Sequence, residues 1–289
     1  IWIDEAQFVS QDESSMYLSF IATLKLINPA LKVVGMTATP FRMGQGLLIE
    51  DGLFTDMCYD MTSLEGFNKL LAEGYMLPLV PKRTRTELDV SSVGMANGDY
   101  IGSQLEKAVD KNEITYAALR EAIALGENRK AWLIFASGID HAEHIATTLT
   151  GFGIDCAAVH SRQKDFGKSE EYNDHAIRAF KEGSLRSVVC YSKLTVGFDN
   201  PAIDLIIDLR PTISTVLHIQ KYCRGTRPSI STNKKDCLVL DFSRNTQILC
   251  CINDPIIPKK KSSLPCDLHV KICEACGFYN HLKVRFCTN

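Results

Sequence analysis

The chain has 289 residues and a mass of 32.2 kDa, which is enough for two domains with cores of their own. Hydrophobic residues make up 45% and charged residues 23%, as in ordinary globular proteins. The net charge of −2 excludes a generally basic nucleic-acid binder, so any nucleic-acid contact must come from a local basic lining.

Short apolar runs alternate with helical patterns, which predicts an α/β fold built on parallel sheets. There is neither an apolar run long enough to cross a membrane nor a secretory signal, so we expect a cytoplasmic protein without a membrane partner. The chain opens inside an apolar strand at residues 1–3, and we therefore expect its first domain to be truncated at the front.

In the first unit the pattern predicts strands at residues 1–3 and 32–37, helices at 14–27 and 63–73, and an irregular stretch over 80–100. In the second unit it predicts strands at residues 131–135, 155–159, 187–191, 204–209 and 236–242, with helices at 140–149, 170–182 and 214–224. The predicted domains are a first lobe at 1–115, a second lobe at 116–250, a linker at 251–265 and a Cys-rich tail at 266–289.

Two adjacent carboxylates follow the first strand directly. Asp4 and Glu5 stand where the carboxyl end of a parallel strand opens into the ligand crevice of an α/β sheet. One carboxylate there can hold Mg²⁺, and the other can deprotonate an attacking water. A plain acidic loop would contain the same two residues, so this pair alone does not decide between the two interpretations.

The next strand leads into Thr37-Ala38-Thr39-Pro40, one βα unit further on. Two small hydroxyl residues at a strand end form a short polar hinge that could relay motion between a hydrolysis site and a neighbouring domain. An ordinary turn is the alternative for this segment taken by itself.

Two more motifs lie in the second unit. Gly197 permits close backbone approach to a phosphate or ribose, and Asp199 can accept hydrogen bonds from sugar hydroxyls or from a neighbouring Arg. Gln220, Arg224 and Arg227 share one face if their helix continues, and two guanidiniums can clamp a triphosphate. A Gly-containing turn and a solvated basic helix end are the alternatives.

In chain order, Asp-Glu-Ala-Gln, Thr-Ala-Thr-Pro, Gly-Phe-Asp-Asn-Pro and Gln-x-x-x-Arg-x-x-Arg-Pro resemble motifs II, III, V and VI of superfamily 2 helicases. The resemblance extends over residues 1–245 and implies two RecA-like lobes, the first of them incomplete. Phe41-Arg42, Val239-Leu240-Asp241-Phe242 and the Cys-rich tail are similar to RadD-type DNA-repair helicases and their phage relatives.

The resemblance implies a role for each matched residue. Asp4 would bind Mg²⁺, Glu5 would be the catalytic base, and Gln7 would couple the site to the second lobe. Arg224 and Arg227 would sense the γ-phosphate of ATP, one of them as an arginine finger.

The remaining matched residues fall into three groups. They are Gly197, Asp199 and Gln220 for nucleotide binding, Thr37 and Thr39 for coupling hydrolysis to strand movement, and Arg42, His160 and Thr195 for contact with nucleic acid. A lone His at a strand end, such as His160, is more often structural.

The sequence departs from the family pattern in three places. Cys223 stands where motif VI usually has Gly, and Tyr191 stands where motif V often has Thr, which affects the fine geometry of both motifs. The sequence also contains no G-x-x-x-x-G-K-[ST] phosphate-binding loop. We therefore expect an ATPase in the parent protein, whereas this fragment should bind ATP weakly and hydrolyse it negligibly.

Four of the eleven cysteines crowd into the tail, which suggests a metal site and not disulfides in a chain without a secretory signal. Cys273-x-x-Cys276-Gly with Cys287 further on is similar to the Ran-binding-protein type of zinc finger and predicts a Zn²⁺ site. Metal-free thiols are the alternative. Candidates for the fourth ligand are Cys266, His269 and His281.

The resulting hypothesis is an ATP-dependent translocase or helicase acting on DNA in repair or recombination, with RNA as a possible substrate. The competing hypothesis is a non-catalytic nucleic-acid-binding module that uses the second lobe, Lys259-Lys260-Lys261 and the zinc tail. A P-loop metabolic kinase is disfavoured because such enzymes have no need of this two-lobe motif order.

Overall fold

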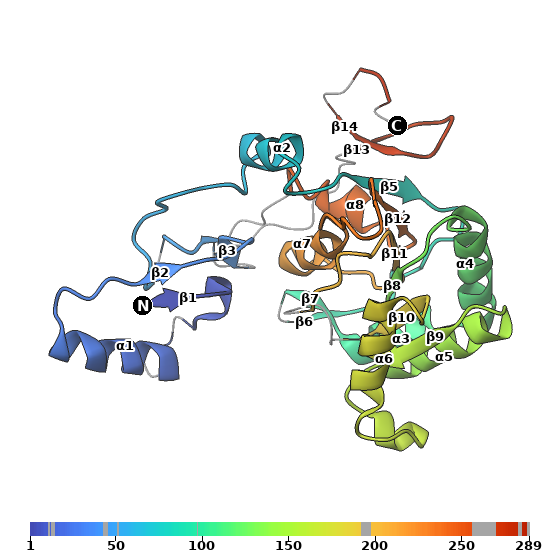
Figure 1. The fold of residues 1–289 in the computed structure, drawn as a ribbon, viewed down its shortest axis with the longest axis horizontal. Helices are drawn as coiled ribbons and strands as arrows, with labels where there is room; N and C mark the ends of the chain where they lie inside the picture. The colour runs from blue at the N-terminus through green and yellow to red at the C-terminus, as the bar shows by residue number, and fades with distance from the viewer. Residues whose placement is uncertain are drawn as a thin grey trace.

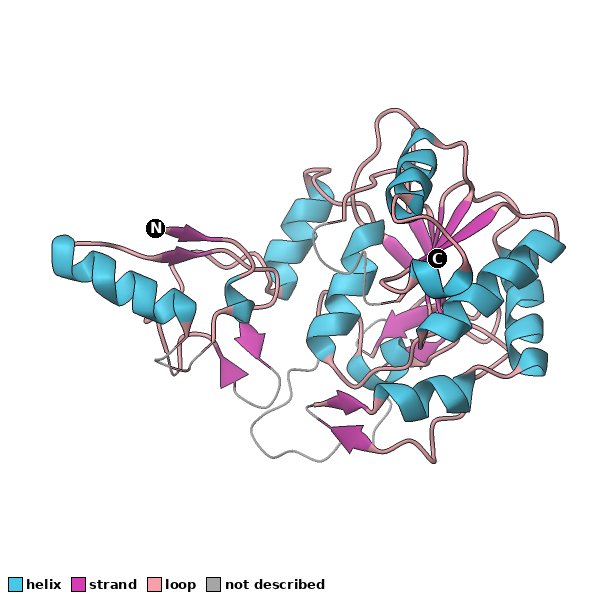
Figure 2. Cartoon of the chain, turned by 90° about the horizontal axis from the view of Figure 1, so that it is seen from below, coloured by secondary structure: helices cyan, strands magenta, loops and turns pink. Residues whose placement is uncertain are grey.

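The computed structural model describes residues 1–10, 12, 15–42, 46–50, 52–96, 98–191, 198–255, 270–282 and 285–287, except for the side chain of His281. Figure 1 shows a small N-terminal unit in blue, a larger α/β unit in green to orange, and a red C-terminal hairpin beside the larger unit. Figure 2, seen from below, shows the same separation between the small unit and the sheet-containing unit.

The N-terminal unit is built on two parallel strands, β1 (Trp2–Ile3) and β2 (Val34–Gly35). Helix α1 (Met16–Ile27) begins after Ser15, whose hydroxyl accepts the backbone N–H of Leu18 over 3.4 Å. The hydrophobic core of this unit is small: its buried cluster consists of Ile3, Val9 and Ile21. The two predicted strands and the helix between them are confirmed, although β2 is shorter than expected.

A hairpin and a helix follow. Strands β3 (Phe41–Arg42) and β4 (Gly46–Leu47) pair antiparallel. Helix α2 (Leu64–Ala72) begins after Ser63, whose hydroxyl caps the backbone N–H of Gly66, and this confirms the helix predicted at 63–73.

The larger unit contains a six-stranded sheet in which every neighbouring pair is parallel. The five strands predicted for the second unit are confirmed. The spatial order is β5 (Leu79–Arg83), β12 (Cys237–Asp241), β11 (Leu205–Asp208), β8 (Trp132–Phe135), β10 (Ser187–Cys190) and β9 (Cys156–Val159).

Alternate side chains of each strand enter two separate cores, because successive residues of a strand point to opposite faces. Leu133 lies in one core and Ile134 in the other. Helices α3 (Gly102–Val109), α4 (Asn112–Leu125) and α5 (Ile139–Gly151) cover one face, and α6 (Tyr172–Glu182) and α7 (Thr215–Tyr222) cover the other. The shorter elements are η1 (Ala6–Phe8), β6 (Met95–Ala96), β7 (Asp99–Tyr100), η2 (Gln163–Phe166), η3 (Cys223–Gly225) and α8 (Asn245–Leu249).

The prediction of an irregular stretch over residues 80–100 was wrong at both ends, because β5 overlaps its beginning and the short strands β6 and β7 lie at its end. β5 pairs with β12 along its whole length, from Leu79 opposite Cys237 to Arg83 opposite Asp241. Pro81 is tolerated because β5 is an edge strand, where a missing N–H costs little. The domain boundary at residue 115 stays a prediction, and this pairing favours a boundary before Leu79.

The C-terminal hairpin packs on the same edge. Strands β13 (Val270–Ile272) and β14 (Tyr279–His281) pair antiparallel. Phe278 forms a bridge with Lys82, and the backbone N–H of Arg83 donates to Gly277 O over 3.0 Å. The hairpin thereby covers part of an otherwise open sheet edge. Among the described residues, every helix is too short or too polar to cross a bilayer.

Candidate nucleotide site

Asp4 and Glu5 leave the carboxyl end of β1 in a tight turn. Glu5 has φ 51° and ψ 49°, the left-handed region that residues other than glycine rarely adopt. Its backbone N–H donates to Asp4 Oδ1 over 2.9 Å, and η1 begins at the next residue. Such conformations concentrate at functional sites, where the surrounding structure holds a side chain in a required direction.

Gln7 joins the Asp-Glu-Ala-Gln motif to the Thr-Ala-Thr-Pro segment. Its side chain is buried, and its Nε2 donates to Glu5 Oε2 over 2.6 Å. Its Oε1 accepts the hydroxyl of Thr37, and Thr37 Oγ1 in turn accepts the backbone N–H of Thr39 over 2.9 Å. One amide therefore links the Glu5 carboxylate to the hydroxyl segment. Coupling of Gln7 to the second unit stays a prediction.

Arg42 stabilises the same turn by donating hydrogen bonds to its backbone carbonyl groups. Its Nε donates to Gln7 O over 3.1 Å, and its Nη2 donates to Val9 O. Burial lowers the pKa of this guanidinium. The structure thus gives Arg42 a role in holding η1, and its predicted contact with nucleic acid is untested.

Arg224 and Arg227 both reach the segment that carries Asp199. Arg224 Nη1 donates to Phe198 O over 2.7 Å, and Arg227 Nη1 donates to the same oxygen over 3.1 Å. Arg227 also forms an ion pair with Asp199. Of the two partners considered for Asp199, a sugar hydroxyl or a neighbouring Arg, the structure shows the Arg.

The helix that carries this pair is shorter than predicted. α7 ends at Tyr222 and continues as the 3₁₀ turn η3, so Gln220 and the arginines do not share one α-helical face. Gln220 is half-buried, and its Nε2 has no partner among the described residues. Gly225 explains the close packing of η3: a Cβ there would lie 2.6 Å from Cys237 Sγ on β12.

The acidic turn lies in the N-terminal unit, and the arginine pair lies in the larger unit. Burial lowers the pKa of Arg224, and the neighbouring Arg227 lowers it further, whereas Cys223 and Glu5 raise it. Carboxylates on one side and guanidiniums on the other are the groups that a magnesium-bound polyphosphate requires.

The remaining residues that were predicted to contact nucleotide or nucleic acid have other outcomes. Gly197 and Thr195 lie outside the described residues. His160 is fully buried; its Nε2 lies 2.6 Å from Glu143 Oε1, and its Nδ1 accepts the backbone N–H of Arg162 over 3.1 Å. With both nitrogens engaged and no exposed surface, His160 has the structural role that a lone histidine most often has, and direct contact with nucleic acid is disfavoured.

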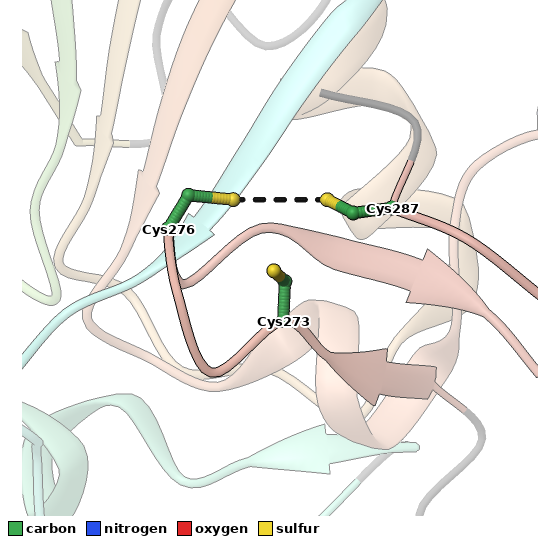
Figure 3. Close-up of side chains that lie close together, drawn as sticks. All are labelled: Cys273, Cys276 and Cys287. Carbon is green, nitrogen blue, oxygen red and sulfur yellow. Dashed lines mark hydrogen bonds between the residues drawn. The ribbon is translucent and has the colours of Figure 1, made fainter.

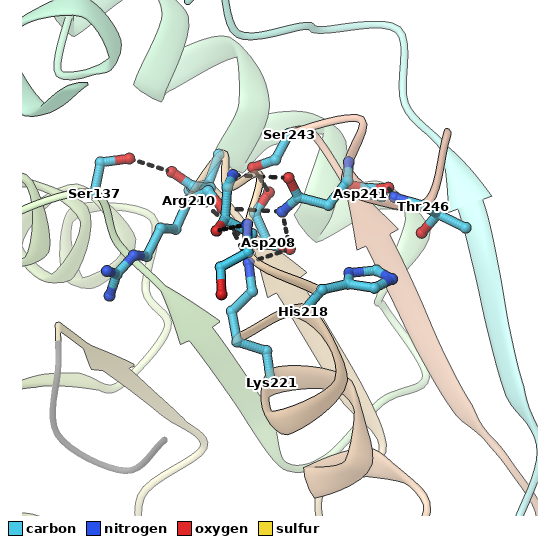
Figure 4. A network of polar contacts seen from close by, with 12 residues as sticks. Ser137, Asp208, Arg210, His218, Lys221, Asp241, Ser243 and Thr246 are labelled. Carbon is cyan, nitrogen blue, oxygen red and sulfur yellow. Dashed lines mark hydrogen bonds and ion pairs between the residues drawn. The ribbon is translucent and has the colours of Figure 1, made fainter. Parts of the chain in front are cut away.

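A buried ion pair beneath α7 escaped the sequence analysis (Figure 4). Lys221 and Asp208 are both fully buried, and Lys221 Nζ donates to Asp208 Oδ1 over 2.7 Å, to Asp208 Oδ2 over 2.6 Å and to Arg210 O over 2.9 Å. The one available signal was a lysine three residues after the buried His218, on the side of the helix where an apolar residue is expected.

The network extends from this pair to α8. Asn245 Nδ2 donates to Asp208 Oδ2 over 2.8 Å, and the backbone N–H groups of Asn245 and Thr246 donate to Asp241 over 3.1 and 2.7 Å. Burial and the adjacent Asp208 raise the pKa of Asp241 to about 6. The network thus ties the carboxyl ends of β11 and β12 to α7, the helix that leads to the arginine pair.

Three tail cysteines meet in the hairpin (Figure 3). The sulfurs of Cys273, Cys276 and Cys287 all lie within 4.8 Å of one another, and those of Cys276 and Cys287 are 3.7 Å apart. Cys266 and His269 lie outside the described residues, as does the side chain of His281. The arrangement can supply three thiolate ligands to a tetrahedral metal ion.

Residues 114–229 match the helicase conserved C-terminal domain. A 51.5 kDa protein of a Lactococcus phage is 28% identical over 217 residues, which cover 73% of this chain and 43% of that protein. The ATP-dependent RNA helicase DHH1 of Candida glabrata is 24% identical over 163 residues, which cover 50% of this chain and 31% of that protein. The chain thus spans less than half the length of these relatives.

The fold also resembles a solved structure. A fragment described as the HsdR subunit of a type I restriction enzyme from Vibrio vulnificus superposes with a TM-score of 0.58 at 16% identity, covering 83% of this chain and 46% of that one. This likeness concerns the fold alone. Residues 114–229 therefore belong to the helicase conserved C-terminal domain, and the chain is similar to superfamily 2 helicases.

Proposed function

We propose that the chain is part of an ATP-dependent nucleic-acid motor that hydrolyses Mg²⁺-bound ATP between its two units. The observation that carries this proposal is the way both motifs are held: Gln7 fixes the Glu5 carboxylate in one unit, and the Arg224 and Arg227 guanidiniums are fixed on the segment with Asp199 in the other. An acidic pair alone or an arginine pair alone has several ordinary explanations. The two together, in a chain that matches the helicase conserved C-terminal domain, fit nucleotide hydrolysis best.

The side chains of the proposed site have the chemical groups that Mg²⁺-bound ATP requires. Asp4 is exposed at the end of β1, and its carboxylate is the kind of oxygen ligand that Mg²⁺ prefers. Glu5 acts as the base that takes a proton from the attacking water, and its hydrogen bond from Gln7 fixes the direction of its carboxylate. Arg224 and Arg227 balance the charge that develops on the γ-phosphoryl oxygens.

Three further sets of residues complete the proposed site. Asp199, Gln220 and Gly197 contact the nucleotide from the second unit, and Thr37 and Thr39 transmit hydrolysis to the nucleic-acid track. We propose DNA as that track, with Arg42 and Thr195 near its backbone, because the motif variants are similar to RadD-type repair helicases. RNA is the alternative.

Hydrolysis of ATP tests the proposal directly. We would measure turnover with and without single-stranded DNA, for the 289-residue chain and for the product of its complete reading frame. Glu5→Gln and Arg227→Ala should each abolish turnover in a folded protein. Arg178→Ala is a matched control because Arg178 is exposed on α6 and makes no hydrogen bond or ion pair within the described chain. No stimulated turnover in the complete product would favour the non-catalytic binding module.

We also propose that Cys273, Cys276 and Cys287 bind Zn²⁺ together with a fourth ligand. The cluster supports this because three sulfurs converge on one point in a chain segment that has only a small core of its own. Zinc content of the purified protein tests it, with Cys276→Ser expected to lower the stoichiometry. Cys58→Ser, at an exposed cysteine far from the cluster in sequence, should leave it unchanged.

A further inference from the structure

The segment with Asp199 and the segment with the two arginines are joined by more than the arginine side chains. We call residues 198–201 the motif V segment and residues 224–227 the motif VI segment. Lys234 lies in the turn before β12 and donates from Nζ to Pro201 O over 3.2 Å, to Gly225 O over 2.7 Å and to Arg227 O over 2.9 Å. One acceptor belongs to the motif V segment and two belong to the motif VI segment.

The ammonium group of Lys234 lies where it can join the two segments through their backbone carbonyl groups. A lysine ammonium has three N–H donors, and here each has a backbone carbonyl as acceptor. The side chain is half-buried, and burial lowers the pKa of its ammonium. Carbonyl oxygens at the end of a 3₁₀ turn have no partners in the turn itself, so the ammonium satisfies groups that would otherwise face a partly dry environment.

Arg227 is therefore held at both ends. Its backbone carbonyl accepts from Lys234, and its guanidinium binds Phe198 O and Asp199. Loss of the lysine would leave the guanidinium contacts in place and release the backbone of η3 from the motif V segment. A displacement of about 1 Å in a positioning element can cost about 100-fold in rate.

We propose that Lys234 is a positioning residue that fixes the motif VI segment against the motif V segment, so that Arg224 and Arg227 meet the nucleotide in one geometry. The proposal rests on the nucleotide-hydrolysing function proposed above. It assigns no direct contact between Lys234 and the nucleotide.

The test compares Lys234→Met with Lys235→Met in the product of the complete reading frame. Both substitutions remove one lysine charge, but Lys235 is exposed and makes no hydrogen bond or ion pair with the described residues. Lys234→Met should lower kcat for ATP hydrolysis roughly 10- to 100-fold while KM for ATP stays within about threefold, because an element used in the transition state is disturbed. Lys234→Arg, whose guanidinium can donate to the same carbonyls, should keep most of the activity.

Equal kcat values for Lys234→Met and Lys235→Met would overturn the proposal, as would a raised KM with unchanged kcat. If Lys234→Met fails to fold, Lys234→Gln replaces it, since its amide keeps two donors. Hydrogen–deuterium exchange of the 289-residue chain gives a readout without turnover: amides at residues 224–227 should exchange faster in Lys234→Met alone. Absence of ATP hydrolysis by the wild type would refute the proposed function. Equal amide exchange rates in all variants would refute the positioning role of Lys234.

Discussion

Replacing Lys221 by methionine should destabilise the larger unit severely. Methionine matches the length and volume of the lysine stem, so the substitution removes the ammonium and leaves the packing of α7 nearly intact. Asp208 then keeps a full negative charge at a position without solvent exposure, with the Asn245 amide as its remaining side-chain donor. Arg210 O loses the lysine at the same time but retains its hydrogen bond from Asn245.

The expected loss in the free energy of unfolding depends on which charged group is left without its partner. Breaking a buried ion pair by removing one partner typically costs about 3–5 kcal/mol, because the other charge stays desolvated and unpaired. Replacing both charges at once should cost much less. The double variant Lys221→Met with Asp208→Asn keeps an acceptor for Asn245 and should recover most of the loss.

Urea unfolding followed by tryptophan fluorescence measures this effect. The chain has two tryptophans: Trp132 is fully buried in β8, and Trp2 is 73% exposed in the other unit. A Trp2→Phe background therefore makes the signal specific to the larger unit. Lys164→Met is the matched control, since Lys164 pairs with Glu170 on the surface and its loss should change little.

Two results would refute the reasoning. The first is a Lys221→Met variant within about 1 kcal/mol of the wild type, which would mean that water or a rearranged neighbour solvates Asp208. The second is a double variant as unstable as the single one, because that would assign the loss to packing and not to the uncompensated charge.

Three further outcomes are expected. Gly225→Ala should cost about 1–3 kcal/mol in urea unfolding, since its methyl group would lie 2.6 Å from Cys237 Sγ, and an unchanged midpoint would contradict the packing described for η3. Burial lowers the pKa of His218 to about 4, so the ring is neutral in the native state and takes up a proton on unfolding; the free energy of unfolding should fall as pH drops from about 6.5 towards 4. His218→Gln, which keeps a donor to Cys250 O, should flatten that fall by up to about 1.4 kcal/mol per pH unit, and an unaltered slope would exclude this histidine as its source. Removal of metal by a chelator should increase proteolysis around Cys276 and leave Trp132 fluorescence unchanged, whereas loss of both signals together would show that the hairpin and the sheet unfold as one unit.

Hydrophobic periodicity located the central strands and their helices because these elements are defined by local patterns. Residues 131–135 form a continuous apolar run, and residues 205–207 form a shorter one, as is typical of strands buried on both faces. β5 was missed for the opposite reason. Its residues, Leu-Val-Pro-Lys-Arg, are half-buried or exposed, contain a proline and form an edge strand, so its identity depends on pairing with β12, more than 150 residues away.

The residues of the candidate site also divide into those that the sequence identifies and those that only the structure identifies. Asp4, Glu5, Arg224 and Arg227 could be named from motif order, since the chemistry of each motif is carried by residue type and spacing. Lys234 and Asp208 could not, because neither stands in a recognisable motif and each joins segments that only the fold brings together.

The sequence by itself determined the α/β class, the order of the four motifs and the chemical groups available to a nucleotide. Each of these properties is local, because it depends on a few neighbouring residues. Only the tertiary structure decided that Gln7 binds Thr37, that the hairpin covers β5, and that Lys234 binds carbonyl groups of both the motif V and the motif VI segments. Those contacts join parts of the chain whose distance from one another is set only when the sheet has formed.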